Sequence, residues 1–354
     1  MNRILIVRLG SLGDIVHTLP VAAAIRRAFP RARIDWLVSA RQRQILDLVP
    51  VIDRRLVLGA SAGSSASGDH PDDAAFAGAG GVLEAIRFLR QARYDVALDL
   101  QGLLKSAVLA RASGAGRVIG FSTRYLRERL ARPFYTEVHE PAGARHVIEK
   151  NLSMLEPLGI RQFKVEFPLD TTVSDVVREV REKTGTGPEG RFVLLNPGAA
   201  WPNKRWPPER LGAVAAGLRD RHALPSVVVW GPGEESLAGT VVGASAGAAV
   251  LAPRTRIGDL VALTRAAALI VSGDTGPLHI ATAVGTPIVG LYGPTSAARN
   301  GPWAAADVTV SRTALCGCHD KRRCRRPTPC LLDVPVDEVL DAVARRLENL
   351  STHA

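Results

Sequence analysis

Short apolar runs alternate with glycine-containing turns and helical patterns along the first half of the chain. The apolar runs predict strands over residues 4–7, 34–38 and 95–100. Apolar positions at helical spacing predict helices that follow the turn at 10–14, cover 82–93 and open at 101–106. The first half is therefore expected to form an α/β layer.

The same alternation returns after the turn-rich residues 184–188. Apolar runs predict strands over residues 192–195, 227–230, 268–271 and 288–291. Because strands that alternate with helices favour a parallel sheet covered on both faces, the two series predict two doubly wound, Rossmann-like α/β domains facing a central cleft. Residues 59–81 are rich in Gly, Ala and Ser and predict a mobile insert or the edge of a lid.

The junction at residues 271–279 predicts a phosphate site. Asp274 or Thr275 is the expected N-cap of a helix that stops at Gly285. The first amides of such a helix are free to bind an anion, and Gly276 lets a ligand approach the backbone closely. The alternative is that the junction is structural punctuation of the kind found in most α/β proteins.

The composition is that of a globular protein. Of 354 residues, 46% are hydrophobic and 22% are charged. The start lacks the apolar stretch of a signal peptide, and the runs at 244–252 and 260–271 are too short to span a bilayer. We therefore expect a cytoplasmic protein whose contact with a membrane is peripheral.

The charge balance is basic, with a formal net charge of +11. Residues 1–170 carry 24 Lys and Arg against 17 Asp and Glu, and residues 117–132 hold five Arg against Glu128, in an expected loop or short helix. This favours acidic partners such as anionic lipid headgroups or acidic sugars, although solvated surface explains most of these charges. The pattern is not that of a single-strand binder, so no nucleic-acid partner is expected.

Four motifs, taken in order, resemble those of one enzyme family. They are residues 8–20 (RLGSLGDIVHTLP), 99–106 (DLQGLLKS), 196–198 with 204–207 (NPG and KRWP) and 272–279 (SGDTGPLH). The chain resembles the ADP-heptose:lipopolysaccharide heptosyltransferases of glycosyltransferase family 9. The first two motifs look most like heptosyltransferase I, which adds the first heptose to the Kdo region of the inner core.

The resemblance implies an inverting enzyme of GT-B architecture that needs no metal and no cofactor. It implies an acceptor-binding domain over residues 1–172, a linker over 173–188 and a nucleotide-sugar-binding domain over 189–330. It also implies a C-terminal helix over 331–354, for which packing back on the first domain is one possible position. The implied partners are a nucleotide sugar, the acidic inner-core acceptor and the cytoplasmic face of an anionic inner membrane.

Asp14 is the candidate general base. An inverting sugar transfer needs a carboxylate that accepts the proton of the acceptor hydroxyl. Asp14 follows two glycines at the end of the first predicted strand, where ligands bind in open α/β sheets. The resemblance favours the base, while the position before an apolar-periodic run is also that of a helix cap.

The departing diphosphate needs positive charge and hydrogen-bond donors. The resemblance places Lys204 there with the amides of Thr275 and Gly276, although a loop lysine is usually solvated. Glu234 matches the residue that binds the adenosine ribose, with Glu235 as the alternative, and either could be a first-turn helix acid. The implied donor-binding set is Ser11, Gly13, Asn196, Lys204, Glu234, Asp274, Thr275, Gly276 and His279.

Four basic residues lie at positions that resemble those proposed to meet the acidic Kdo sugars. Carboxylates are bound by Arg and Lys because these side chains donate charge-assisted hydrogen bonds. The implied acceptor-binding set is Lys105, Arg127, His146 and Lys150. The small residues at 59–81, where basic ones are expected, leave the acceptor's identity open.

All four cysteines fall within fifteen residues, flanked by basic side chains; they are Cys316, Cys318, Cys324 and Cys330. Four soft ligands could hold zinc, but the C-x-C-x5-C-x5-C spacing lacks paired C-x2-C knuckles. We favour thiols over a metal site and expect catalysis not to depend on them.

Two other classes of function remain open. One is a different GT-B enzyme, acting on another sugar nucleotide or a later heptose position, or a sugar-nucleotide epimerase. The other is a noncatalytic protein that binds nucleic acid or metal, which the basic charge and the cysteines suggest but which leaves the four motifs unexplained.

Overall fold

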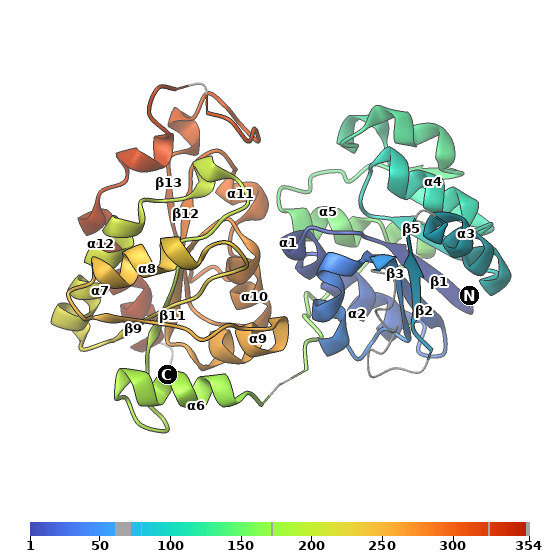
Figure 1. The fold of residues 1–354 in the computed structure, drawn as a ribbon. Helices are drawn as coiled ribbons and strands as arrows, with labels where there is room; N and C mark the ends of the chain where they lie inside the picture. Colours follow the sequence, from blue (N-terminus) through green and yellow to red (C-terminus); the bar gives the residue numbers. More distant parts are fainter. Residues whose placement is uncertain (61–71, 79, 171–172, 325, 352–354) are drawn as a thin grey trace. The chain divides into compact units, whose positions relative to one another are not determined.

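The chain folds into two compact units, Met1–Asp170 and Thr171–Ala354 (Figure 1). This computed structural model describes residues 1–60, 72–78, 80–170, 173–324 and 326–351. Each unit is a parallel sheet with its own hydrophobic core, which confirms the predicted α/β fold. In the part of the chain described, no helix is both long and apolar enough to cross a membrane.

Seven parallel strands of the described chain form the sheet of the first unit, in the order β4-β3-β2-β1-β5-β6-β7. The strands are β1 (Arg3–Val7), β2 (Arg33–Ser39), β3 (Arg54–Ala60), β4 (Ala74–Ala77), β5 (Val96–Asp99), β6 (Arg117–Phe121) and β7 (Glu137–His139). The helices are α1 (Leu12–Val16), α2 (Leu19–Ala28), α3 (Gly81–Ala92), α4 (Leu104–Ala112) and α5 (Val147–Ser153). The strand order reverses between β1 and β5.

The second unit has a six-stranded parallel sheet in the order β10-β9-β8-β11-β12-β13. The strands are β8 (Val193–Asn196), β9 (Ser226–Val228), β10 (Ala249–Leu251), β11 (Leu269–Gly273), β12 (Ile288–Tyr292) and β13 (Val308–Ser311). The helices are α6 (Asp175–Thr184), α7 (Pro208–His222), α8 (Glu235–Gly243), α9 (Ile257–Ala266), α10 (Gly276–Val284), α11 (Ala297–Asn300) and α12 (Val336–Ser351). Its order reverses between β8 and β11, as in a doubly wound nucleotide-binding sheet.

The central strands are uninterrupted apolar runs because a parallel sheet with helical crossovers is covered by helices on both faces. Residues 4–7 of β1 and 269–271 of β11 are fully buried. Trp36 on β2 is also fully buried, and its Nε1 donates to the carbonyl of Arg8 at 3.0 Å. The core of the first sheet therefore fixes the backbone that leaves β1.

Part of the segment predicted as an insert belongs to the sheet. Ala74–Ala77 form strand β4, which pairs with β3 at one edge of the first sheet. Residues 61–71 and 79 lie outside the described residues. The composition of 59–81 hid this strand because alanine is a weak signal for β structure.

The segments expected as linker and C-terminal helix have defined positions in the second unit. Within 173–188, residues Asp175–Thr184 form α6, which contacts α9 and β10. Helix α12, from the expected 331–354 segment, contacts α7, β12 and β13. The apolar stripe of α12 is thus buried on its own unit, through Val339, Leu340 and Val343.

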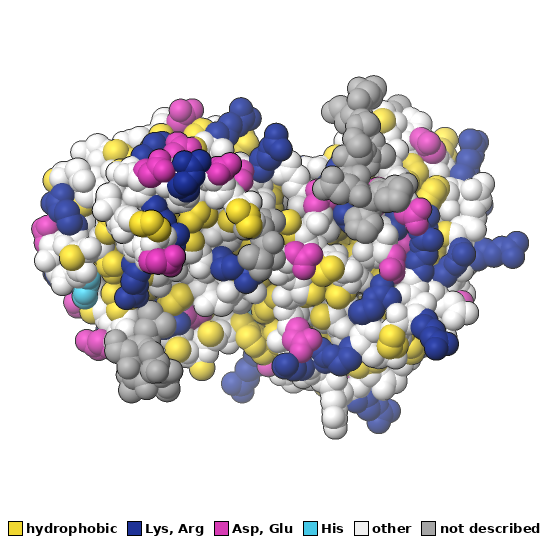
Figure 2. Space-filling model, turned by 90° about the horizontal axis from the view of Figure 1, so that it is seen from below, with side chains coloured by type: hydrophobic (Ala, Val, Ile, Leu, Met, Phe, Trp, Pro, Cys, Tyr) yellow, Lys and Arg dark blue, Asp and Glu magenta, His cyan; other side chains and the backbone are white. Residues whose placement is uncertain are grey.

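The basic segment 117–132 is only partly a loop. Arg117 begins β6 and pairs with Glu137 on β7 at 2.6 Å, which corrects its expected placement in a loop or short helix. Arg129 begins a short 3-10 helix, Arg129–Phe134, in which Arg132 is also exposed. Figure 2 shows Lys and Arg spread over the visible face of both units and interspersed with acidic side chains, as expected of solvated surface.

Candidate active site

Both sheets present their candidate residues at the carboxyl ends of the two strands that flank the reversal in strand order. In the first unit, residues 8–14 follow β1 and residues 100–106 follow β5. In the second, residues 196–198 lie at the end of β8 and residues 274–279 follow β11. Open α/β sheets bind ligands at this point because the two loops diverge there. The four sequence motifs therefore meet in pairs, one pair in each unit.

Asp14 lies in α1, just beyond the end of β1, with partners on both carboxylate oxygens. Arg8 Nη2 is 2.6 Å from Oδ1, and Arg127 Nη2 is 3.8 Å from Oδ2. The backbone N–H and the hydroxyl of Ser11 donate to Oδ2 at 3.0 and 3.1 Å. The Asp14 side chain is 17% exposed, so solvent still reaches the carboxylate.

The electrostatics keep Asp14 ionised. Burial alone raises the pKa of Asp14, but the charges of Arg8 and Arg127 and the hydrogen bond from Ser11 outweigh burial and hold this pKa well below its usual range. Ser11 and Asp14 also form a capping box at the start of α1. The N-cap is therefore Ser11 and not Asp14, which supports the cap from the third helical position. This leaves a role as base open, because the charged carboxylate remains partly exposed.

Sequence reasoning missed the contribution of Arg8. Its side chain is buried, and its Nη1 donates to the carbonyl of Leu100, the residue that directly follows β5. Gln101 completes this contact, since its Oε1 accepts from the N–H of Leu9 at 3.0 Å. The available signal was an arginine placed directly after a buried strand, because a charge so close to the core needs a partner.

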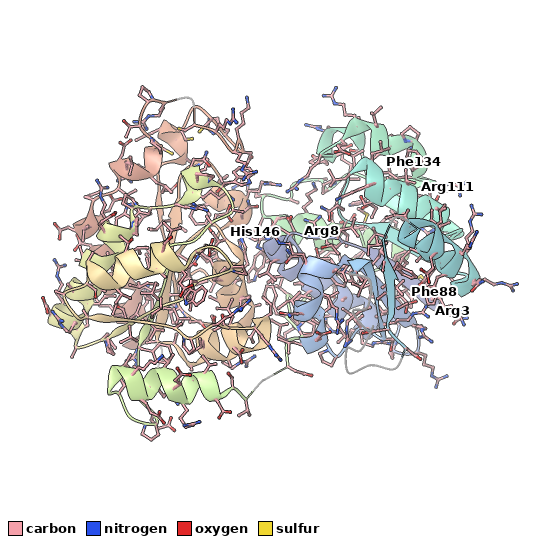
Figure 3. All side chains as sticks on the ribbon, viewed as in Figure 1. Arg3, Arg8, Phe88, Arg111, Phe134 and His146 are labelled. Atoms are coloured by element: carbon pink, nitrogen blue, oxygen red, sulfur yellow. The ribbon has the colours of Figure 1, made fainter. Side chains whose placement is uncertain are left out.

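Two predicted acceptor residues, His146 and Lys150, belong to α5. His146 is the N-cap of α5: its Nδ1 accepts from the N–H of Ile148 at 3.1 Å, and its ring meets the edge of His17 at 5.8 Å between centroids. Figure 3 labels His146 and Arg8 in the first unit. Lys150 donates to the carbonyl of Tyr125 at 3.0 Å. His146 is thus tied to the helix that carries Asp14, since His17 directly follows α1.

The other two predicted acceptor residues are exposed. Arg127 is 54% exposed while it faces Asp14. Lys105 is exposed in the first turn of α4, where the N–H of Leu104 donates to Glu128 at 2.6 Å. Glu128 follows Arg127 in the chain, so the start of α4 lies beside the loop that carries Arg127.

Lys204, Asp274 and His279 form a hydrogen-bonded triad that marks the candidate diphosphate site of the second unit. Lys204 Nζ lies 2.7 Å from Asp274 Oδ2, and His279 Nε2 lies 3.0 Å from Asp274 Oδ1. Burial alone raises the pKa of Asp274, but the hydrogen bond and charge of His279 and the charge of Lys204 hold it well below its usual range. The Asp274 carboxylate therefore fixes Lys204 and His279 at the end of β11.

The predicted helix start after β11 is confirmed. Thr275 is the N-cap of α10, Gly276 and Pro277 open the helix, and Gly285 ends it in the left-handed conformation at φ 77°. The Thr275 side chain does not cap the helix but accepts a hydrogen bond from Asn196 at 2.9 Å. The start of α10 is therefore a candidate anion site, and the Lys204 ammonium is held by Asp274, the residue before its N-cap.

The loop after β8 is packed tightly against Glu234. Asn196 donates to Ser272 at 2.9 Å, which joins the ends of β8 and β11. Glu234 accepts from the N–H of Gly231 at 3.0 Å, and a Cβ at Gly198 would collide with its carboxylate. Glu235 is exposed at the start of α8. Of the two glutamates, Glu234 is the one directed at the candidate nucleotide loop.

Ser11 and Gly13 belong to a different unit from the other predicted donor residues. Ser11 is the N-cap of α1 and Gly13 is buried within it, beside Asp14. Both belong to the first unit, whereas Asn196, Glu234 and the Asp274 triad belong to the second.

The four cysteines lie close together as free thiols. Cys316 Sγ is 2.7 Å from Cys318 Sγ, which is 3.6 Å from Cys324 Sγ. Burial and the hydrogen bond with Cys316 raise the pKa of Cys318 and of Cys330 to about 12. In the described ranges, no group of three or more His, Cys, Asp or Glu side chains is placed to hold a metal ion. The preference for thiols over zinc stays a prediction.

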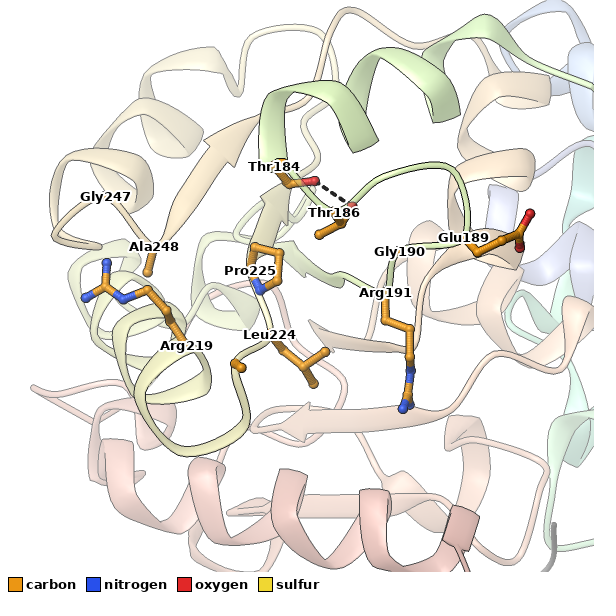
Figure 4. A pocket seen from close by; sticks show the side chains of 12 residues that line it. Thr184, Thr186, Glu189, Gly190, Arg191, Arg219, Leu224, Pro225, Gly247 and Ala248 are labelled. Atoms are coloured by element: carbon orange, nitrogen blue, oxygen red, sulfur yellow. Dashed lines mark hydrogen bonds between the residues drawn. The ribbon is translucent and has the colours of Figure 1, made fainter.

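A cavity of about 680 Å³ opens at the other end of the second sheet (Figure 4). Its lining comes from the chain that precedes β8, β9 and β10, including Arg191, Pro225 and Ala248. These are the amino ends of the strands, whereas the Lys204 and Asp274 pair lies at the carboxyl ends. The cavity is therefore separate from the candidate phosphate site.

Solved structures share this fold. The family 9 glycosyltransferase of Veillonella parvula matches with a TM-score of 0.79 at 22% identity, over 98% of both chains. The E. coli heptosyltransferase WaaC, solved with ADP, matches with a TM-score of 0.71 at 22% identity, over 99% of both chains. These similarities confirm the GT-B architecture.

Sequence relatives confirm the resemblance found in the motifs. Lipopolysaccharide heptosyltransferase 1 of Pseudomonas aeruginosa is 28% identical over 91% of this chain and 87% of its own length. Lipopolysaccharide heptosyltransferase 3 of E. coli K12 is 30% identical over 82% of both. The profile of glycosyltransferase family 9 (heptosyltransferase) matches residues 82–328. Because this match covers more than half of the chain, the protein belongs to glycosyltransferase family 9, the heptosyltransferases, and is a glycosyltransferase.

Proposed function

We propose that this enzyme transfers heptose from ADP-heptose to the Kdo region of the lipopolysaccharide inner core, as a heptosyltransferase of type I. The observation that carries the proposal is that Lys204 and the start of α10 are joined through Asp274, the residue directly before the N-cap Thr275. Together they supply a fixed cation and a helix N-terminus, which is what a sugar diphosphate requires as leaving group. Sequence relatives of types 1 and 3 support the lipopolysaccharide core as the acceptor class.

In the proposed reaction, Asp14 accepts the proton of the acceptor hydroxyl. The hydroxyl oxygen attacks the anomeric carbon from the face opposite the diphosphate, the carbon–oxygen bond to the diphosphate breaks, and ADP leaves with the electron pair. The configuration at that carbon is therefore inverted. The lowered pKa keeps Asp14 ionised but makes it a weak base, so the proton is proposed to transfer late, when the forming bond has made the hydroxyl acidic.

On the donor side, Lys204 and the α10 amides take up the charge that develops on the diphosphate, without a metal ion. Asp274 and His279 hold Lys204 in place. Asn196, Thr275 and Gly276 shape the phosphate loop. Glu234 is proposed to accept hydrogen bonds from the ribose hydroxyls, and Ser11 and Gly13 are proposed to contact the donor.

On the acceptor side, Lys105, Arg127, His146 and Lys150 are proposed to bind the acidic Kdo sugars. The neighbouring exposed arginines are proposed to hold the enzyme on the cytoplasmic face of the anionic inner membrane. Each Lys or Arg near such a surface contributes about 1 kcal/mol. Nucleic acid is not proposed as a partner, since the basic residues lie beside acidic ones on the surface.

A donor and acceptor panel tests the proposal. Purified enzyme is incubated with ADP-heptose and with lipopolysaccharide acceptors truncated before the first heptose, after it, or after the second. We expect transfer only to the acceptor that ends in Kdo. Transfer only to a heptose-bearing acceptor would instead identify a later position, and turnover of a sugar nucleotide without any acceptor would support an epimerase.

A further inference from the structure

The Lys204 turn, residues 201–206, is bonded to the cysteine-rich segment of the second unit. We define the cysteine loop as residues 316–324 and 326–334. Asn203 Nδ2 donates to the carbonyl of Lys321 at 2.8 Å, and Trp206 Nε1 donates to the carbonyl of Val334 at 3.2 Å. The cysteine loop therefore holds the chain immediately before Lys204 and shortly after it.

The cysteine loop is itself firmly anchored. Cys316, Cys318 and Cys330 are buried against one another. The N–H of Asp320 donates to the carbonyl of Pro294 at 2.7 Å, and Leu331 is fully buried in the core of the unit. Lys321 itself is exposed, so the buried residues on either side of it are what hold its carbonyl relative to the sheet.

The opposite side of the Lys204 turn rests on the end of β11. A Cβ placed at Gly273 would lie 2.9 Å from the carbonyl oxygen of Lys204. That distance is well inside van der Waals contact, so the turn approaches the strand as closely as a glycine permits. The turn is thus held between β11 and the cysteine loop.

Asn203 is the side chain that connects the turn to the loop. It is 6% exposed, and its Oδ1 is buried with no hydrogen-bond partner in the described part of the chain. Because a carbonyl can only accept, the bond to Lys321 fixes the orientation of the amide. A buried amide with an unsatisfied oxygen costs stability, so packing alone would favour an apolar residue here.

We infer that Asn203 is a positioning residue that fixes Lys204 against the donor diphosphate by tying the Lys204 turn to the cysteine loop. This inference rests on the proposed role of Lys204. Lys204 has four rotatable side-chain bonds, and its contact with Asp274 constrains only the ammonium end. The Asn203 bond constrains the backbone from which the side chain starts, so its loss lets the ammonium sample positions away from the phosphates.

A double-mutant cycle with ADP as probe tests the inference. The dissociation constant of ADP is measured by calorimetry for the parent, Asn203→Ala, Lys204→Met and the double variant. Asn349→Ala is the matched control, because Asn349 also donates to a backbone carbonyl in the second unit, that of Ala306, but is exposed. Asn203→Leu is the second variant, because leucine fills the same space but cannot donate a hydrogen bond. If Asn203→Ala does not fold, the cycle is measured with Asn203→Leu instead.

We expect Lys204→Met to weaken ADP binding about ten- to a hundredfold, as for a charge-assisted hydrogen bond, and Asn203→Ala about three- to tenfold. In the Lys204→Met background, Asn203→Ala should change the ADP dissociation constant by less than about twofold, because the residue it positions is gone. Asn349→Ala should bind ADP like the parent.

Two results would overturn the inference. One is an Asn203→Ala effect of the same size with and without Lys204, which identifies a structural role. The other is ADP binding that Asn203→Ala and Asn203→Leu leave unchanged while Lys204→Met weakens it. If Lys204→Met itself leaves ADP binding unchanged, the proposed donor site fails, and the positioning role fails with it.

Discussion

Asp274→Asn is the substitution that most directly tests the charged triad. Asp274 is 4% exposed at its side chain and pairs with Lys204 and His279 at 2.7 and 3.0 Å. An asparagine has the same shape but no charge, and its NH2 group must face one of the two former donors. Breaking a buried ion pair by removing one partner costs about 3–5 kcal/mol, and we expect a loss of unfolding free energy in or just below this range.

The pH dependence of the unfolding free energy provides an independent test of the role of Asp274. The folded-state pKa of Asp274 lies below its unfolded value of about 3.9. The stability it contributes is therefore fully present above that unfolded pKa and is lost as pH falls toward the folded pKa. Between about pH 5 and pH 2, the unfolding free energy of the parent should consequently fall more steeply than that of Asp274→Asn.

Urea denaturation at several pH values measures both effects. Asp337→Asn is the control, because Asp337 forms an exposed pair with Arg221 in the same unit and should change stability by less than about 0.5 kcal/mol. The reasoning is refuted if Asp274→Asn unfolds with the same free energy as Asp337→Asn and with the same slope against pH.

Three further predictions concern the reacting groups and the acceptor face. Asp14→Asn should lower turnover by about two to four orders of magnitude with ADP-heptose binding little changed, and near-normal turnover would exclude Asp14 as the base. Glu234→Gln should raise the dissociation constant of ADP while Glu235→Gln does not, because only Glu234 packs on the Gly198 loop; calorimetry that shows the reverse order assigns the ribose to Glu235. A variant with four arginines replaced by Gln should raise the acceptor KM and weaken binding to anionic vesicles at low salt, with the ADP-heptose KM almost unchanged and Arg127→Gln alone giving the largest single effect. Binding of vesicles and acceptor like that of the parent would refute the proposed contact of these arginines with the membrane and the acceptor. The substituted residues are Arg124, Arg127, Arg129 and Arg132.

The sequence predicted the elements whose signals are local. The runs at 4–7 and 268–271, the cap at Thr275 and the stop at Gly285 all depend on residues adjacent in the chain, and the structure has each of them. Strand β4 was missed because Ala74–Ala77 becomes a strand through its pairing with β3 rather than through its own propensity.

The pairings within the site could not be read from the sequence. Arg8 meets Asp14 because α1 turns back toward the end of β1, and Asn203 meets Lys321 across more than a hundred residues of chain. Such contacts depend on which segments the fold brings together. Neither the periodicity of apolar residues nor the spacing of motifs predicts which side chains will meet. Asp274 was identified as a candidate, but its role as the shared partner of Lys204 and His279 became visible only in three dimensions.

The boundary at Asp170 and Thr171 has a consequence for how this enzyme can diversify. No strand pairing in the described chain crosses it, and each unit buries its own core. An exchange of residues 1–170 between relatives would therefore interrupt neither sheet and would replace the proposed acceptor residues as one block, while the Lys204 and Asp274 pair stayed intact. Under the proposed division of roles, the residues that choose the sugar acceptor can therefore change without a change in either sheet or in the residues proposed to take the leaving group.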